Sequence, residues 1–162
     1  MSPGGSRGTG SAVEVVRSSV VRAPRDEVWA RVVTAEGVSD EFRPLLRMRF
    51  PAGLAGASIA DLPLGRSIGR AWILLGGVIP VEYDDLVVVE MEAPRYFQER
   101  SELGSCRVWE HRRELDSLAD GSTRITDTLR AVPRALVPGP VVRAVVSALF
   151  DHRHRRLARG FR

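Results

Sequence analysis

The sequence lacks lysine altogether, contains a single cysteine, and has no long hydrophobic run. One cysteine, Cys106, excludes an intramolecular disulfide framework and a zinc site built from several cysteines. The longest apolar run, residues 71–81, is interrupted by two glycines and a proline. It is far shorter than the roughly 20 residues that a membrane-spanning helix needs. We therefore expect a cytoplasmic protein with no integral membrane association.

Arginine supplies all 24 basic residues, which explains a sequence pI near 10.4 at a net charge of only +4. Arginine keeps its charge over the pH range in which lysine would lose it. The arginines are spread along the chain rather than clustered, except at the C-terminus. This distribution favours the codon usage of a GC-rich genome over nucleic-acid binding, so we expect no nucleic-acid partner.

The chain of 162 residues is long enough for one domain with its own core, and 44% hydrophobic and 27% charged residues are typical of a globular protein. Residues 1–12 are rich in glycine and serine and contain no apolar stretch. They predict a disordered tail rather than a signal peptide. The expected organisation is a tail over residues 1–12 and a single domain over residues 13–162.

The N-terminal part of this domain predicts a strand followed by two helices. Residues 13–22 alternate and are rich in valine, which indicates a strand. Pro24 and two acidic residues after it suit the start of a helix, whose apolar face contains residues 28, 29, 32 and 33. We expect Gly37 to end this helix, and a second short helix to begin at Ser39 and stop before Pro44.

Strand-like segments make up the middle of the chain: residues 46–50, 67–75, 81–91, 95–103, 106–115 and 123–132. Turn residues separate most of them, for example Gly76-Gly77, Gly104-Ser105 and Asp120-Gly121. Such short connections indicate neighbouring antiparallel strands rather than parallel strands linked by helices.

The C-terminal segment, residues 138–161, carries the clearest helical pattern, with apolar residues at three- and four-residue steps. Pro138 and Pro140 mark its start. The element order is therefore β-α-α-β-β-β-β-β-β-α, an α+β protein with about seven strands.

A family resemblance is carried by five stretches: residues 23–29, 72–85, 97–101, 109–113 and 151–157. With the element order, they resemble the bacterial ligand-binding branch of the START-like, or SRPBCC, superfamily of polyketide cyclases and lipid-binding proteins. The resemblance covers residues 13–161. It implies a helix-grip fold, in which a curved antiparallel sheet wraps around the long C-terminal helix and leaves a hydrophobic cavity between them. It implies no particular reaction, because the superfamily includes carriers, cyclases, hydroxylase domains and regulators.

Charged side chains fall on faces that should be buried. By the two-residue period of strands, four polar residues share a face with Phe97, Trp109 or Ile125, namely Glu99, His111, Arg113 and Asp127. Arg153 lies in the apolar stripe of the last helix. A buried charge needs a partner. We expect Arg153 to form an ion pair with Glu99 or Asp127.

Two interpretations of this polar cluster stay open. In the structural one, Arg113 and Arg153 bridge to the two carboxylates and fasten the last helix to the sheet. In the functional one, His111 and a carboxylate form a general acid–base pair that acts on a bound ligand. The structural or ligand-orienting interpretation is favoured, because a polar network at one end of a cavity easily produces such a pair.

Other polar residues carry weaker signals. His152 and His154, two apart on a helix, point in different directions, so we predict no metal site and no cofactor. Asp84 and Asp85 are expected at a charged strand edge or in salt bridges, and Cys106 as a small buried hydrophobe.

The favoured function is a carrier or sensor for a lipid-like, polyketide-like or aromatic molecule, acting as a monomer or homodimer. The polar cluster would orient its head group, and the expected cavity wall is Trp72, Leu74, Phe97, Trp109, Ile125, Val146 and Phe150. A cyclase or dehydratase using His111 is the first alternative. An interaction or regulatory module using the arginine-rich C-terminus is the second.

Overall fold

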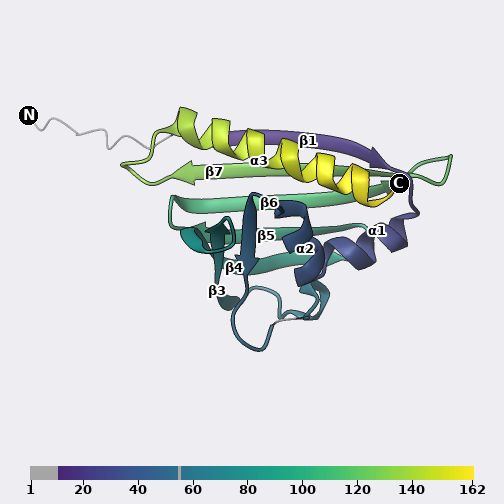
Figure 1. Ribbon diagram of the computed structural model, residues 1–162, viewed down its shortest axis with the longest axis horizontal. Helices are drawn as coiled ribbons and strands as arrows, with labels where there is room; N and C mark the ends of the chain where they lie inside the picture. Colours follow the sequence, from purple (N-terminus) through teal and green to yellow (C-terminus); the bar gives the residue numbers. More distant parts are fainter. Residues whose placement is uncertain (1–10, 55) are drawn as a thin grey trace, which may run out of the picture.

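The computed structural model describes residues 11–54 and 56–162 and forms a seven-stranded antiparallel sheet with helices on one side (Figure 1). Most of the tail predicted over residues 1–12 lies outside the described residues. The elements, in chain order, are β1 (Val13–Val21), α1 (Arg25–Val32), α2 (Ala35–Phe42), β2 (Leu46–Arg49), a 3-10 turn (Ile59–Asp61), β3 (Ser67–Leu75), β4 (Ile79–Glu92), β5 (Tyr96–Leu103), β6 (Cys106–Ser117), β7 (Thr123–Pro133) and α3 (Gly139–Gly160).

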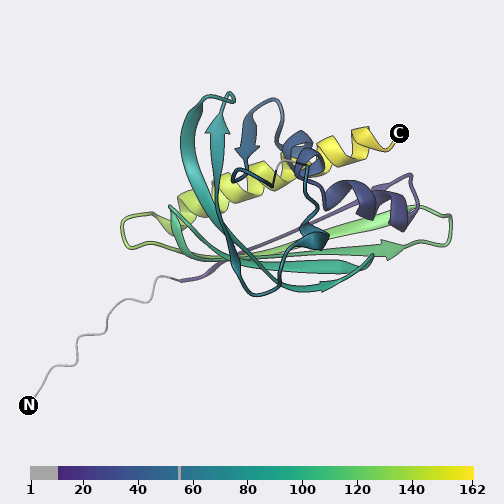
Figure 2. The ribbon, with the colours of Figure 1, turned by 90° about the horizontal axis from the view of Figure 1, so that it is seen from below.

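Strand order in the sheet is β1-β7-β6-β5-β4-β3-β2, so strands β2 to β7 each pair with their neighbours in the sequence. Only β1 pairs out of sequence, with β7. Figure 2 shows that β3 and β4 rise away from the rest of the sheet, so that α3 lies within its curve. The predicted α+β helix-grip fold is therefore confirmed. No helix of the described ranges is both long and apolar enough to cross a membrane.

Three groups of buried apolar residues hold the layers together. At one end of the sheet, α1 buries Val28 and Val32 against β6, β7 and the end of α3. The N-terminal half of α3 packs Val146 and Phe150 on β1, β6 and β7. The third group joins Phe42 of α2 to β2 and β3. The second and third groups face each other across the space in which the cavity lies.

The junction between α1 and α2 differs from the prediction. Gly37 does not end the first helix, since α1 ends at Val32 and α2 begins at Ala35. Thr34 caps α2, and its hydroxyl oxygen accepts a hydrogen bond from the Gly37 N–H at 3.0 Å. A glycine is required at position 37 for another reason: a β-carbon there would lie 2.0 Å from the carbonyl oxygen of Arg31.

We expect Gly37→Ala to lower the free energy of unfolding by about 1–3 kcal/mol, because the backbone of α1 must move to admit the methyl group. Gly139→Ala is the matched control, since a β-carbon at Gly139 has its nearest neighbour at 4.0 Å. Urea denaturation followed by circular dichroism measures both variants. Equal stabilities of the two variants would contradict the close approach of α1 and α2.

Candidate functional site

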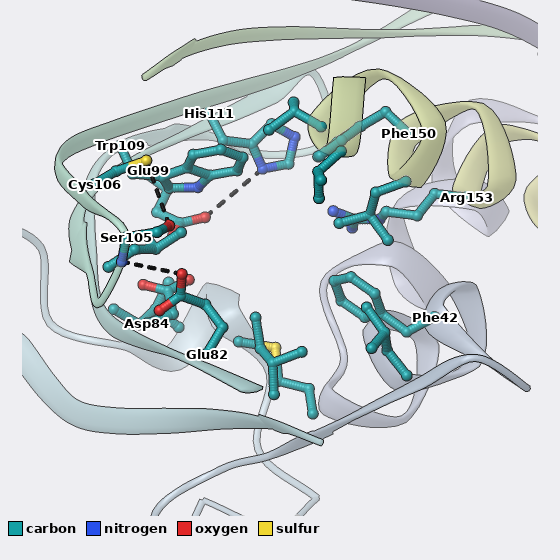
Figure 3. Close-up of a pocket in the computed structure, with 18 of the residues that line it drawn as sticks. Phe42, Glu82, Asp84, Glu99, Ser105, Cys106, Trp109, His111, Phe150 and Arg153 are labelled. Carbon is teal, nitrogen blue, oxygen red and sulfur yellow. Dashed lines mark hydrogen bonds and ion pairs between the residues drawn. The ribbon is translucent and has the colours of Figure 1, made fainter. Parts of the chain in front are cut away.

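A cavity of about 400 Å³ lies between the sheet, α2 and α3 (Figure 3). This volume is within the usual range for small-molecule sites. Its wall is mostly apolar and comes from α2, α3, the 3-10 turn and strands β2 to β6, with Phe42, Met48, Leu86, Phe97, Trp109 and Phe150 among the lining residues. Three further lining residues, Val81, Val141 and Val145, are 53–59% exposed. The cavity therefore reaches the surface between β4 and the N-terminal half of α3.

Four of the seven residues expected in the apolar wall line the cavity: Phe97, Trp109, Val146 and Phe150. Trp72 does not, because it is 40% exposed and packs edge-on against Tyr83. Leu74 and Ile125 are buried but lie away from the cavity. Ile73, which lies between Trp72 and Leu74 in the sequence, lines the cavity in their place. Trp72 therefore lies on the opposite face of β3 from Ile73, and the strand register shifts between Ile73 and Leu74.

One end of the cavity is acidic. Glu82 and Asp84 of β4 and Glu99 of β5 all line it, close to His111 of β6 (Figure 3). Asp84 is only 6% exposed. The expectation of a charged strand edge is wrong for Asp84 and Asp85 alike, because β4 lies between β5 and β3. Asp85 accepts a hydrogen bond from the Ser67 hydroxyl.

Asp84 and Glu99 have opposite pKa shifts. Burial raises the pKa of Asp84 well above its usual range, and the neighbouring Glu99 raises it further. Burial would also raise the pKa of Glu99, but the neighbouring His111 and Asp84 outweigh it and lower the pKa. The Ser101 hydroxyl also donates to Glu99 Oε1, at 2.9 Å. Of the two carboxyl groups, Asp84 therefore keeps its proton to higher pH than Glu99 does.

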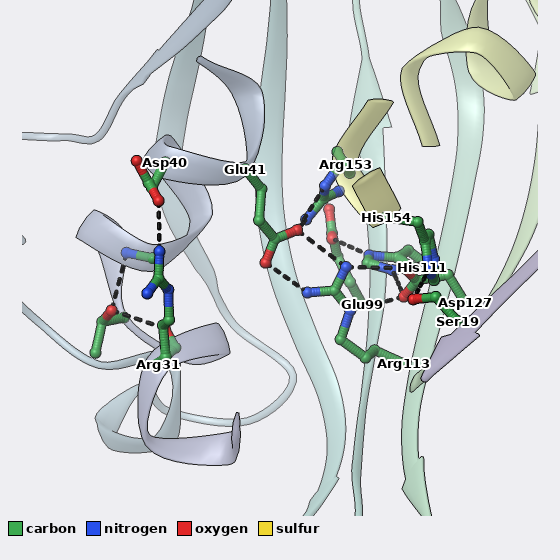
Figure 4. Close-up of polar contacts among 12 residues, drawn as sticks. Ser19, Arg31, Asp40, Glu41, Glu99, His111, Arg113, Asp127, Arg153 and His154 are labelled. Atoms are coloured by element: carbon green, nitrogen blue, oxygen red, sulfur yellow. Dashed lines mark hydrogen bonds and ion pairs between the residues drawn. The ribbon is translucent and has the colours of Figure 1, made fainter. Parts of the chain in front are cut away.

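Behind this end, a buried ion-pair network connects α2, α3 and the sheet (Figure 4). Arg113 donates to both oxygens of Asp127, each at 2.8 Å, and to both oxygens of Glu41, at 2.7 and 3.0 Å. Arg153 donates to Glu41 Oε2 at 2.8 Å. Nε2 of His154 lies 2.9 Å from Asp127 Oδ2, and its Nδ1 lies 2.6 Å from the Ser19 hydroxyl.

Arg153 is buried, as its place in the apolar stripe predicts. The predicted partner is wrong, because Arg153 pairs with Glu41 rather than with Glu99 or Asp127. The two-residue period of strands can only suggest partners within the sheet, whereas Glu41 lies on α2. Glu99 and Arg153 line the cavity, while Arg113 and Asp127 lie behind its wall and support it.

The pKa shifts show which groups the network keeps charged. Burial would raise the pKa of Glu41, but Arg113 and Arg153 outweigh it and lower the pKa. Burial also opposes ionisation of Asp127, yet Arg113 and His111 hold its pKa well below the usual range. Burial would lower the pKa of His111, but Asp127 and Glu99 raise it overall. The network is thus a set of compensated charges that fastens α2 and α3 to β6 and β7.

Both ring nitrogens of His111 face carboxylates of the protein. Its Nε2 lies 2.8 Å from Asp127 Oδ1, and its Nδ1 lies 3.7 Å from Glu99 Oε2. The ring faces the cavity between Phe97 and Phe150, with edge-on contacts to both. The polar groups best placed to meet a ligand are therefore the carboxyls of Asp84 and Glu99 rather than the imidazole.

Four residues of this region were missed by the sequence analysis: Glu41, Glu82, Asp84 and His154. Helical and strand periods could have located three of them. Glu41 follows the buried Val38 by three positions, and His154 follows the buried Phe150 by four. Asp84 shares a strand face with Leu86 and Val88. Nothing in the sequence singles out Glu82.

Several solved structures share the fold of this chain. A protein from Chromobacterium violaceum has a TM-score of 0.72 at 11% identity, over 92% of this chain and 97% of that one. A START superfamily protein from Mycobacterium smegmatis has a TM-score of 0.64 at 15% identity, over 91% and 96%. CalU16 from Micromonospora echinospora has a TM-score of 0.61 at 13% identity, over 94% and 83%.

These likenesses establish a START-like fold. No curated protein matches the sequence. The family described as "Domain of unknown function (DUF8410)" matches residues 19–161, almost the whole of the sheet and all three helices. The chain therefore belongs to the DUF8410 family.

Proposed function

We propose that residues 13–162 form a single binding domain that holds an apolar small molecule between the sheet and α3, as a carrier or a sensor. The observation that supports this best is the cavity of about 400 Å³, which reaches the surface and has one acidic end. A wall dominated by apolar side chains with a few converging polar groups is typical of small-molecule sites. The START-like fold of the structural neighbours agrees with a binding role.

The cavity geometry favours binding over cyclase or dehydratase chemistry at His111. Nε2 of His111 lies 2.8 Å from Asp127 and Nδ1 faces Glu99 at 3.7 Å, so both nitrogens are directed at carboxylates of the protein rather than at the open cavity. The arginine-rich C-terminus is also partly used within the chain. Arg153 is buried, and Arg156 donates to the Asp40 carboxylate at 3.0 Å.

Binding of a neutral apolar dye, Nile red, tests the proposal. We expect saturable binding with one site per chain. Val146→Trp, which places an indole in the cavity, should weaken binding about tenfold or more, because the dye and the added ring compete for the same space. Fluorescence titration measures the dissociation constant, and thermal unfolding confirms that the variant is folded.

The control is Val16→Trp, which adds the same ring on the outer face of β1, where Val16 is exposed. Loss of binding in Val146→Trp alone supports the cavity as the site. Equal dye binding by both variants would place the dye elsewhere and contradict the proposal. If the dye binds in the cavity, native mass spectrometry of protein purified from its own host would identify a retained ligand by its mass.

A further inference from the structure

Asp84 is a buried carboxyl group in the cavity wall, and residues 11–54 and 56–162 place no cation in a salt bridge with it. Its Oδ1 is one of two buried side-chain polar atoms in the described ranges that have no hydrogen-bond partner, the other being Arg25 Nε. Only Asp84 of these two lines the cavity. A buried acceptor without a donor is costly, and native structures usually satisfy it. The carboxyl is therefore a candidate contact for a ligand.

The other charged groups that line the cavity already have partners within the chain. Glu82 accepts hydrogen bonds from the backbone N–H groups of Tyr83, Gly104 and Ser105, at 2.9, 2.7 and 3.1 Å. Gly104 makes this possible, because a β-carbon there would lie 2.6 Å from Glu82 Oε1. Arg153, a cationic group of the wall, is held by Glu41 at 2.8 Å. Asp84 thus stands out in having room for a ligand group.

The charges around Asp84 disfavour an anionic ligand at this end. Glu82 lies on the same strand and Glu99 on β5, and both line the cavity, whereas Asp85 does not. On β3 the neighbour of Asp84 is the uncharged Ala71. The cationic groups that face the cavity, His111 on β6 and Arg153 on α3, each contact carboxylates of their own. Figure 3 shows Arg153 across the cavity from Asp84. This end therefore carries an excess of carboxyl groups, although the whole chain has a net charge of +4.

We propose that the acidic end of the cavity binds a protonated amine, at the end of an otherwise apolar ligand, through the Asp84 carboxyl. This inference rests on the proposed binding function and specifies its ligand class. An ammonium group offers both a positive charge and the N–H donors that Asp84 Oδ1 lacks. As it binds, any proton on Asp84 leaves to solvent, so that the ligand cation replaces the proton. A carboxylate head group would meet like charges and be excluded.

Three probes with the same ten-carbon body separate the possible head groups: decylamine, decanol and decanoate. Each is used to displace Nile red from the full chain at pH 6 and pH 8. We expect decylamine to bind at least about tenfold more tightly than decanoate at both pH values, and more tightly at pH 8, where it competes with fewer protons. Decanol should bind less tightly than decylamine. Calorimetry in buffers of different ionisation enthalpy should show up to one proton released per decylamine bound, and none for decanol.

Asp84→Asn should abolish both the proton release and the preference for decylamine over decanol. Asp85→Asn is the matched control, because this neighbouring side chain faces the other side of the sheet and contacts Ser67. It should retain both properties. Thermal unfolding verifies that each variant is folded, and Nile red binding verifies that the cavity is intact.

Binding of decanoate as tightly as decylamine, or proton release that persists in Asp84→Asn, would overturn the proposal for the head group. In either case Nile red binding would leave the binding function standing. Failure of the unaltered chain to bind Nile red would instead contradict the binding function itself, and the head-group proposal with it.

Discussion

Replacing Glu41 with alanine is expected to lower the free energy of unfolding by about 3–5 kcal/mol, the range for breaking a buried ion pair. Glu41 is almost fully buried and accepts hydrogen bonds from Arg113 and Arg153. Its removal leaves the Arg153 guanidinium without its carboxylate and Arg113 with one of its two. Because arginine does not deprotonate in proteins, neither residue can escape the cost by losing its charge. Urea denaturation at pH 7 measures the loss.

Glu36→Ala is the matched control, since Glu36 lies on the same helix and is exposed. We expect it to change stability by no more than about 0.5 kcal/mol. The double variant Glu41→Leu with Arg153→Met should recover much of the loss, because it removes the stranded cation and replaces the pair by apolar side chains. A loss in Glu41→Ala no larger than in Glu36→Ala would show that the network does not stabilise the fold.

Sequence patterns predicted the order of the elements because turn residues and hydrophobic periodicity are local properties of the chain. Turn residues such as Gly104 and Gly121 separate strands whose ends differ from the predicted ones by a few residues. The error at Gly37 shows the limit of this reasoning. The sequence analysis took Gly37 as the end of a helix. A glycine is needed there because the Arg31 carbonyl oxygen lies too close for a β-carbon, and that distance depends on how α1 and α2 pack. The START-like fold itself was predicted from family resemblance rather than from these patterns.

Strand parity correctly predicted that Glu99, His111, Arg113 and Asp127 are buried, because β5, β6 and β7 pair without register shifts at these positions. In β3, where no such face was assigned, Trp72 was expected in the cavity wall but lies on the face opposite to Ala71 and Ile73. Partners were harder to predict than burial. A two-residue period tells which face a side chain occupies, but not which helix packs against that face.

Asp127→Asn is expected to have the second large effect, a loss of about 3–5 kcal/mol near neutral pH. Asp127 is fully buried and contacts Arg113, His111 and His154 at 2.8, 2.8 and 2.9 Å. Asparagine keeps the shape but removes the charge, and one of its two polar groups is a donor that faces other donors. Asp116→Asn, an exposed position on β6, is the control and should be close to neutral.

The pH dependence of stability distinguishes the role of Asp127 from simple packing. Arg113 overcomes burial and holds the pKa of Asp127 low, so its contribution is present above the unfolded pKa of about 3.9 and is lost as the pH falls through the folded value. Asp127 overcomes burial and raises the pKa of His111. That contribution is fully present below about pH 6.5 and is lost as the pH rises through the raised value.

In Asp127→Asn, burial should dominate at His111 and bring its pKa down. Urea denaturation between pH 4 and pH 9 should then show a smaller fall in stability on the alkaline side than in the unaltered chain. Asp84 contributes a fall of the same sign, because its raised pKa makes ionisation costly in the folded state, and this part should remain. Alkaline slopes that coincide in the two proteins would show that Asp127 does not hold His111 in its charged form.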